Sequence, residues 1–243
     1  QEQVLGKPLA AGLDFSVATP SNFWDDIAAG RPVDAARLAD IPQGVAVSDL
    51  WVSRLTASAA KGQSWLHALM LAIAALDRGD KAVASTHLRH SLEQHPSWLG
   101  YRIEALLSDD ADARSQSYLR AWQAGGAPPE LAIEIAMHFV TLKRSADLKA
   151  FVDSLPSDVR EKERIILARA VVAADAADFD ELERLLFSRQ FASIREGETL
   201  LSDLWVRLRR GRLETSLGRA PTDAETRADL VAHPLPKALD LRM

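Results

Sequence analysis

The stretch from Trp65 to Pro96 constrains the fold of this chain most, because it predicts two short amphipathic helices folded back on each other. Gly79 and Asp80 predict the turn between them. Glycine suits the end of the first helix because it readily adopts a left-handed backbone conformation. The second helix should end before Pro96, since proline lacks the amide donor that a helix interior requires.

Small and large side chains alternate in this helix pair in the manner of a helical repeat. Small residues such as Ala72 and Ala84 let two helices approach closely, and larger ones such as Leu88 fill the groove between them. The pattern resembles one tetratricopeptide repeat, which is about 34 residues long. It departs from that family at Ala68, where an aromatic residue is usual, and at Ala75, where tyrosine is usual.

The remainder of the chain also favours helices. Of its 243 residues 47% are hydrophobic, which is enough for a sizeable core, and its richness in alanine, leucine, arginine and glutamate favours helix over sheet. Short loops between the predicted helices imply antiparallel neighbours. We therefore predict an all-α fold of tetratricopeptide-like antiparallel helix pairs, stacked as a short right-handed solenoid. After the first pair, helices are predicted over 98–107, 112–124, 146–155, 158–174, 178–187, 196–217 and 222–231. A further helix is predicted to begin at Pro129, with an apolar stripe of Ile133, Ala136, Met137 and Val140.

Residues 1–46 differ from the rest, because four prolines and three glycines before residue 44 interrupt any long helix. A short strand through Leu13, Phe15 and Val17 and a short helix through Phe23, Trp24 and Ile27 are predicted there. We predict an extended, proline-rich docking segment or linker over 1–46 and a helical domain over 47–243.

The charge of the chain argues against nucleic acid as a partner. The formal net charge is −5, whereas nucleic-acid-binding proteins normally carry a basic excess. A local basic cluster comprises Arg207, Arg209, Arg210 and Arg212. At 100° per residue these side chains spread around a helix, so we expect them to pair with acids and not to line a phosphate-tracking surface.

The absence of cysteine excludes a disulfide-stapled fold and leaves the compartment open. No run of about 18 apolar residues is present, so we predict no membrane partner and take the cytoplasm as the expected location. The chain begins with Gln1 and shows no signal-peptide pattern. We expect a fragment or a processed product.

No arrangement of side chains in the sequence predicts catalysis. His87 and His90 share a helix face with His95 nearby, but no cysteine or carboxylate stands at a partner spacing, so no metal site and no other cofactor is predicted. Gly-x-Ser-x-Gly and phosphate-binding loop motifs are absent. The chain alone is expected to lack catalytic residues.

Four aromatic residues are the candidate binding residues. Trp98 and Tyr101 are three residues apart on one predicted helix, and Tyr118 and Trp122 are four apart on the next. They are either ordinary helix-packing residues or, in part, an exposed platform that stacks on sugars or peptide side chains. Their exposure decides between the two interpretations.

The C-terminal part carries a second resemblance. Residues 195–198, followed by Leu201, by 203–205 and by the segment 234–243, resemble the closing segment of large bacterial tetratricopeptide-repeat proteins. The resemblance implies that an uncharacterised, carbohydrate-active β-sandwich region precedes the repeats in the parent protein. It adds Arg195 and Glu196 to the candidate binding residues, although acids in the first turn of a helix are also explained by the helix dipole.

Two functions are compatible with these patterns. The first is a non-catalytic interaction and scaffolding module, whose partner is its own missing N-terminal domain or another protein chain. The alternative is a portion of a glycoside-processing enzyme that contributes residues to a shared cleft and contacts a glycan.

Overall fold

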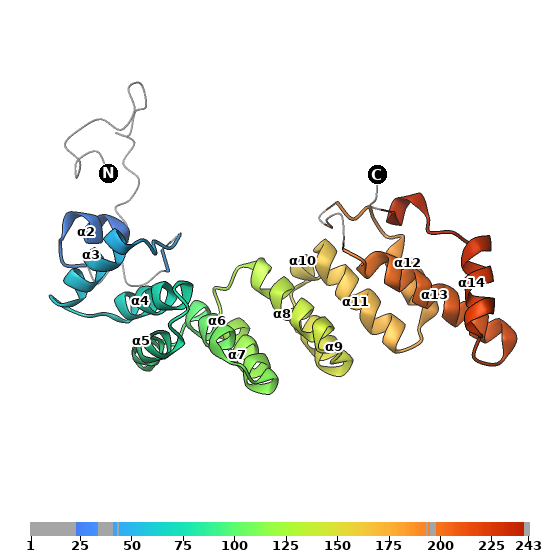
Figure 1. The fold of residues 1–243 in the computed structure, drawn as a ribbon, viewed down its shortest axis with the longest axis horizontal. Coiled ribbons are helices and arrows are strands. Elements are labelled where there is room, and N and C mark those ends of the chain that lie inside the picture. Colours follow the sequence, from blue (N-terminus) through green and yellow to red (C-terminus); the bar gives the residue numbers. More distant parts are fainter. Residues whose placement is uncertain (1–22, 34–40, 43, 193, 195–197, 241–243) are drawn as a thin grey trace, which may run out of the picture. The chain divides into compact units, whose positions relative to one another are not determined.

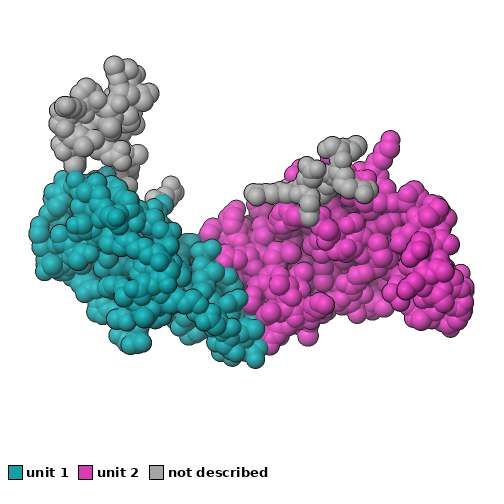
Figure 2. Space-filling view, in the orientation of Figure 1, with its two compact units in different colours: residues 1–127 teal, residues 128–243 magenta. Residues whose placement is uncertain are grey.

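A computed structural model gives the fold, and it describes residues 23–33, 41–42, 44–192, 194 and 198–240. The described residues form an all-α structure of helices and connecting turns, as the composition predicts (Figure 1). The chain divides into two compact units, unit 1 over 1–127 and unit 2 over 128–243 (Figure 2). The predicted boundary between residues 46 and 47 is a different division and stays a prediction. The strand predicted through Leu13, Phe15 and Val17 lies outside the described residues.

Unit 1 contains the predicted helix pair and its neighbours. The boundaries of the helices over 65–96 and 98–107 agree with the predictions, and the short helix at Phe23 is confirmed. Its helices are α2 (Phe23–Ala29), α3 (Asp49–Ala59), α4 (Trp65–Asp77), α5 (Lys81–Gln94), α6 (Trp98–Leu107) and α7 (Ala111–Gln123).

Helix α4 is the centre of the unit 1 core. It is buried on nearly all sides, and Leu66, Leu69 and Ala72 are fully inaccessible to solvent. Helix α5 packs on it through Ala84, which is also fully buried. Since alanine side chains are short, the two backbones approach closely, as the sequence pattern predicts. Helix α2, from the proline-rich N-terminal part, adds Phe23 to the same core.

Unit 2 contains the remaining helices. Pro129 opens its first helix at the predicted position, and Thr222 caps α14 in a capping box with Glu225. The helices are α8 (Pro129–Thr141), α9 (Ser145–Ser154), α10 (Ser157–Arg160), α11 (Glu163–Asp175), α12 (Phe179–Leu186), α13 (Leu200–Leu217) and α14 (Asp223–Ala232), with the 3-10 turn η2 (Lys237–Leu239).

Two details of the predicted helices in unit 2 are wrong. On α8 the predicted stripe is displaced: Ile133, Met137 and Val140 are only half-buried, and the buried face is Leu131, Ala132, Ile135, Ala136 and Phe139. The helix predicted over 158–174 is broken between α10 and α11. Val159 and Ile165 would point about 120° apart on one helix, and the break lets both reach the core.

Helix pairs recur along the chain at nearly constant intervals. The first helices of four pairs begin at Trp65, Trp98, Pro129 and Glu163, which are 33, 31 and 34 residues apart. Three of the four pairs also share one turn, in which a residue with positive φ follows the first helix: Gly79 (φ 78°), Lys143 (φ 56°) and Ala177 (φ 56°). This recurrence identifies an α-helical repeat fold.

Candidate functional site

Unit 1 contains a groove between three successive helices, which we call the Tyr101 groove. It is a cavity of about 440 Å³, in the range of ligand-binding clefts. Its floor is apolar and its rim carries charges of both signs. The lining residues are Ser85, Leu88, Arg89, Leu92 and Glu93 from α5, Tyr101, Glu104 and Leu107 from α6, and Arg120 from α7 (Figure 1 shows these helices).

The rim of the groove is held by a polar network between α6 and α7. An Nη2 hydrogen of Arg120 is donated to Oε2 of Glu104 at 2.7 Å, and the hydroxyl of Ser117 donates to the same carboxylate oxygen at 2.9 Å. The Arg120 guanidinium also lies 5.0 Å from the centre of the Tyr101 ring, a cation–π distance. These contacts fix the orientation of Tyr101 and Arg120 before any ligand arrives.

The floor of the groove depends on a close approach of α5 to α6. Gly100 is buried on α6, and a Cβ atom at that position would lie only 2.7 Å from Cδ2 of Leu92. Leu88 lies beside it with only 4% of its surface exposed. The glycine therefore allows the leucines of α5 to form a continuous apolar floor against α6.

The structure places the predicted aromatic residues in different environments. Tyr101 is half-buried in the groove. Tyr118 is only 5% exposed, which favours the packing interpretation for this ring. Trp98 packs against the unit 1 core, and Trp122 is half-buried on α7. Arg195 and Glu196, the other two predicted binding residues, lie outside the described residues.

Glu104 and Arg120 were not selected as candidate residues by the sequence analysis. They stand 16 positions apart on two helices, so no local spacing marks them as a pair. Glu104 follows Tyr101 by three positions on α6, which is the only signal that could have drawn attention to it.

His67 is a second polar residue that the sequence analysis missed. It is 1% exposed, its Nε2 lies 3.1 Å from the hydroxyl of Ser58 on α3, and its Nδ1 accepts from the backbone N–H of Ser64 at 3.4 Å. Burial lowers the pKa of His67. Because no substrate could reach this ring in the folded chain, we assign it to structure: it joins α3 to the N-terminus of α4. The spacing of Ser64 and His67, an N-cap followed by its N3 position, was the available signal.

The three histidines considered for metal binding have separate roles. His95 stacks on Trp65 with ring centres 4.3 Å apart, and His90 is hydrogen-bonded to Gln94 at 2.8 Å. The pKa of His87 is lowered by burial and by the nearby His90. Within the part of the chain that the structure describes, no group of three or more potential ligands could hold a metal ion. In the same residues no helix is long and apolar enough to cross a bilayer.

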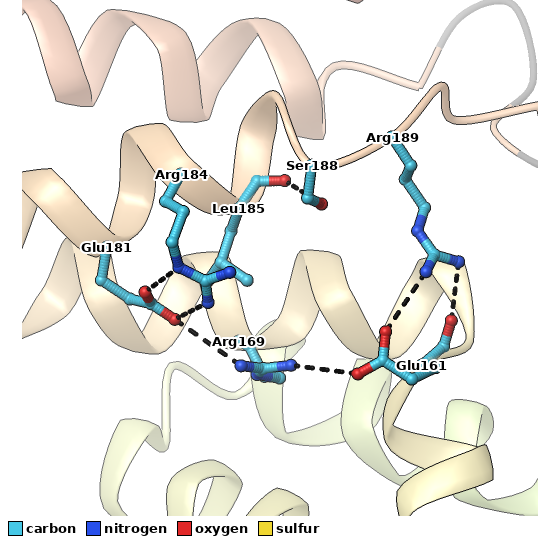
Figure 3. Close-up of polar contacts among 7 residues, drawn as sticks. All are labelled: Glu161, Arg169, Glu181, Arg184, Leu185, Ser188 and Arg189. Carbon is cyan, nitrogen blue, oxygen red and sulfur yellow. Dashed lines mark hydrogen bonds and ion pairs between the residues drawn. The ribbon is translucent and has the colours of Figure 1, made fainter.

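Unit 2 carries an extended network of arginines and glutamates around α11 and α12 (Figure 3). Arg184 makes two bonds of 2.6 Å to Glu181, and Arg169 lies 3.6 Å from the same carboxylate. Arg169 also lies 4.0 Å from Glu161, to which Arg189 donates at the backbone oxygen and at the carboxylate. The hydrogen bond to Arg184 is the main cause that lowers the pKa of Glu181. The network ties α11 to α12 and to the segments at their ends.

Three of the four arginines of the α13 cluster, all except Arg210, are shown paired with acids. Arg207 is bonded to Asp175 of α11, and Arg212 to Asp180 and Glu183 of α12. Arg209 is bonded to Asp229 of α14. These arginines therefore connect α13 to its neighbouring helices, and no basic stripe results.

Comparison with known proteins does not supply a relative. No family model matches the chain, and no match was found among curated proteins or solved structures. The function is therefore argued from the geometry of the described residues.

Proposed function

We propose that this chain is a non-catalytic helical-repeat binding module that holds an extended segment of a protein partner in the Tyr101 groove. The observation that carries the proposal is the groove itself: an apolar floor from α5 beside a rim of oriented charged and aromatic side chains from α6 and α7. Apolar floors supply affinity, and a few fixed polar groups supply orientation and specificity. A peptide offers both kinds of group along its length.

A peptide suits the groove better than a sugar does. Sugars stack on the open face of an aromatic ring, whereas one side of the Tyr101 ring already faces the guanidinium of Arg120 at 5.0 Å. Arg120 and Glu104 instead offer a charged donor and a charged acceptor, which match the backbone and side-chain groups of a peptide. A glycan contact is therefore the alternative outcome of the test and not the proposed function.

The proposal extends to the class of fold and to the parent protein. The intervals of 33, 31 and 34 residues between helix pairs support tetratricopeptide-like pairs, and we extend the proposal to their stacking in a right-handed solenoid. The C-terminal resemblance is the support for a large bacterial parent with a carbohydrate-active N-terminal region, which would be the first partner to test. A cytoplasmic location belongs to the same proposal, since a chain without cysteine needs no oxidising compartment to fold.

A peptide selection tests the groove directly. The full chain is used to select binders from a random dodecapeptide library, and selected peptides are titrated against wild type and against Tyr101→Ala with Arg120→Ala. We expect the double variant to lose at least tenfold in affinity for groove binders. Arg184→Ala, in unit 2, is the matched control and should leave the affinity unchanged.

Two results separate the alternatives. If every selected peptide binds the double variant as tightly as the wild type, the groove is not the binding site. If a glycan array instead gives ligands whose binding requires Tyr101, the carbohydrate alternative replaces the proposed function. Titration with the N-terminal region of a longer parent protein tests that partner in the same way.

A further inference from the structure

The C-terminal segment of unit 2 over 234–240, which we call the strap, lies between two cavities. The first is about 460 Å³ and the second about 490 Å³. The apolar lining of the first comes from Leu201, Trp205 and Val206 of α13, Leu230 of α14, and Leu235 and Leu239 of the strap. The second lies beside Phe187 and Phe191 and includes Lys237 of the strap.

One residue of the strap, Pro236, has the backbone conformation of a proline-rich ligand, and the 3-10 turn η2 follows it directly. Pro236 has φ −60° and ψ 142°, which is polyproline II backbone. The carbonyl of Pro236 accepts from the backbone N–H of Leu239 at 2.9 Å, within the 3-10 turn that follows it. The indole N–H of Trp205 donates to the carbonyl of His233, immediately before Pro234, at 3.4 Å.

Aromatic and apolar side chains receive the strap. Trp205 and Phe187 pack edge to face with ring centres 6.2 Å apart. Leu239 is 2% exposed, and Leu235, four positions earlier, is half-buried. Aromatic-lined grooves with apolar pockets are a recurring means of binding proline-rich segments, because such segments lose little entropy when they bind.

Charged groups connect α13 to α14 and to His233 at the start of the strap. Arg209 of α13 bonds to Asp229 of α14 at 2.8 Å and to Nδ1 of His233 at 2.9 Å. Its guanidinium lies 5.9 Å from the centre of the Trp205 ring. The tryptophan is thereby oriented from α13 and α14, independently of the strap's leucines.

The strap does not fill the space in which it lies. Two clefts that open to solvent, both of ligand size, flank this segment. Val206 and Phe187 stay 38% and 47% exposed at its borders. A longer or bulkier segment of the same chemistry would cover more of this apolar surface than the strap does.

We propose that the surface of unit 2 beneath the strap is a second peptide groove, and that the strap is its internal competitor. The partner it fits is an extended segment of another protein that carries proline and leucine in the pattern of Pro234–Leu235–Pro236 and Leu239. Such a segment binds only when the strap leaves the groove. Its apparent association constant is therefore the intrinsic constant multiplied by the fraction of chains whose groove is free.

The test uses the full chain with Leu235→Ser and Leu239→Ser, which releases the strap. The probe is a fluorescein-labelled peptide with the sequence of residues 234–240, and binding is followed by fluorescence anisotropy. We expect the probe to bind this variant at least tenfold more tightly than the wild type. Addition of Val206→Glu, within the groove, should abolish binding, whereas Leu217→Ser, at an exposed position of the same helix, should not.

Two outcomes overturn the proposal. One is a variant that keeps its helical circular dichroism and binds the probe no better than wild type does. If the variant instead loses its helical circular dichroism, the wild-type chain is used. Its amide hydrogen exchange is measured with and without the unlabelled peptide at millimolar concentration. The amides of Leu239 and Asp240 should then exchange at least threefold faster than in its absence; unchanged exchange refutes the competition.

Discussion

The two units build helix interfaces of the same kind from different interactions. In unit 1, α4 and α5 meet through small apolar side chains, and α4 is buried almost throughout. In unit 2, α13 is tied to α11, α12 and α14 by arginine–carboxylate pairs in addition to its buried leucines. Apolar burial supplies most of the folding free energy, while exposed ion pairs contribute little and mainly select register. Two repeat-like units can therefore share helix geometry and differ in the interactions that stabilise them.

The largest expected effect is removal of apolar volume from unit 1. Leu66→Ala empties a fully buried position of α4 and should lower the free energy of unfolding of unit 1 by about 2–5 kcal/mol. Chemical denaturation followed by hydrogen exchange of both units measures it. Leu106→Ala, at an exposed position of α6, is the control. A loss below 1 kcal/mol would break the assignment of unit 1 stability to α4 packing.

A smaller effect is expected from added volume in unit 2. A Cβ atom at Gly211 would lie 1.9 Å from the Phe179 ring, so Gly211→Ala should destabilise unit 2 by about 1–3 kcal/mol. At Gly100 in unit 1 an added Cβ would lie 2.7 Å from Cδ2 of the flexible Leu92 side chain and 3.1 Å from the Ser97 hydroxyl, so the loss expected from Gly100→Ala is smaller. Thermal unfolding of both variants measures the two losses of stability. A larger loss of stability in Gly100→Ala than in Gly211→Ala would contradict the contact geometry.

Acid should affect unit 1 through its buried histidine. The pKa of His67 is lowered in the folded chain from its ordinary 6.5, so the unfolded chain binds the proton more readily. Stability therefore falls as the pH drops below about 6.5, and is fully present above it. His67→Gln keeps a residue that can complete the capping box, and should reduce this pH dependence to the part that His87 causes. Denaturant titrations between pH 5 and 8 measure the slope; an unchanged slope in the variant would refute the role of His67.

The smallest effect is expected from a single ion pair in unit 2. Arg212→Ala removes exposed bonds to Asp180 and Glu183 and should cost about 0.2–1 kcal/mol. The difference from wild type should shrink in 1 M salt, where screening extends over about 3 Å. Arg210→Ala on the same helix is the control. If Arg212→Ala lowers the free energy of unfolding more than Gly211→Ala does, ion pairs and not apolar packing are the main source of stability in unit 2.

Much of the fold follows from local patterns. Gly79, Pro96 and Pro129 mark helix ends whose physical cause is confined to a few residues, and the structure confirms them. The break between α10 and α11 could not be predicted in this way, because it depends on bringing Val159 and Ile165 to one core. The candidate site was predicted only through Tyr101, since Glu104 and Arg120 meet across two helices.

The all-α class, the approximate lengths of most helices and the close pairing of α4 with α5 follow from local sequence patterns, because helix propensity, caps and small-residue spacing act over a few residues. The tertiary structure alone decided which helix faces are buried, which arginines meet which carboxylates, and where grooves remain beside Tyr101 and the strap. These features depend on contacts between residues far apart in the chain, and such contacts are specified only once the helices pack.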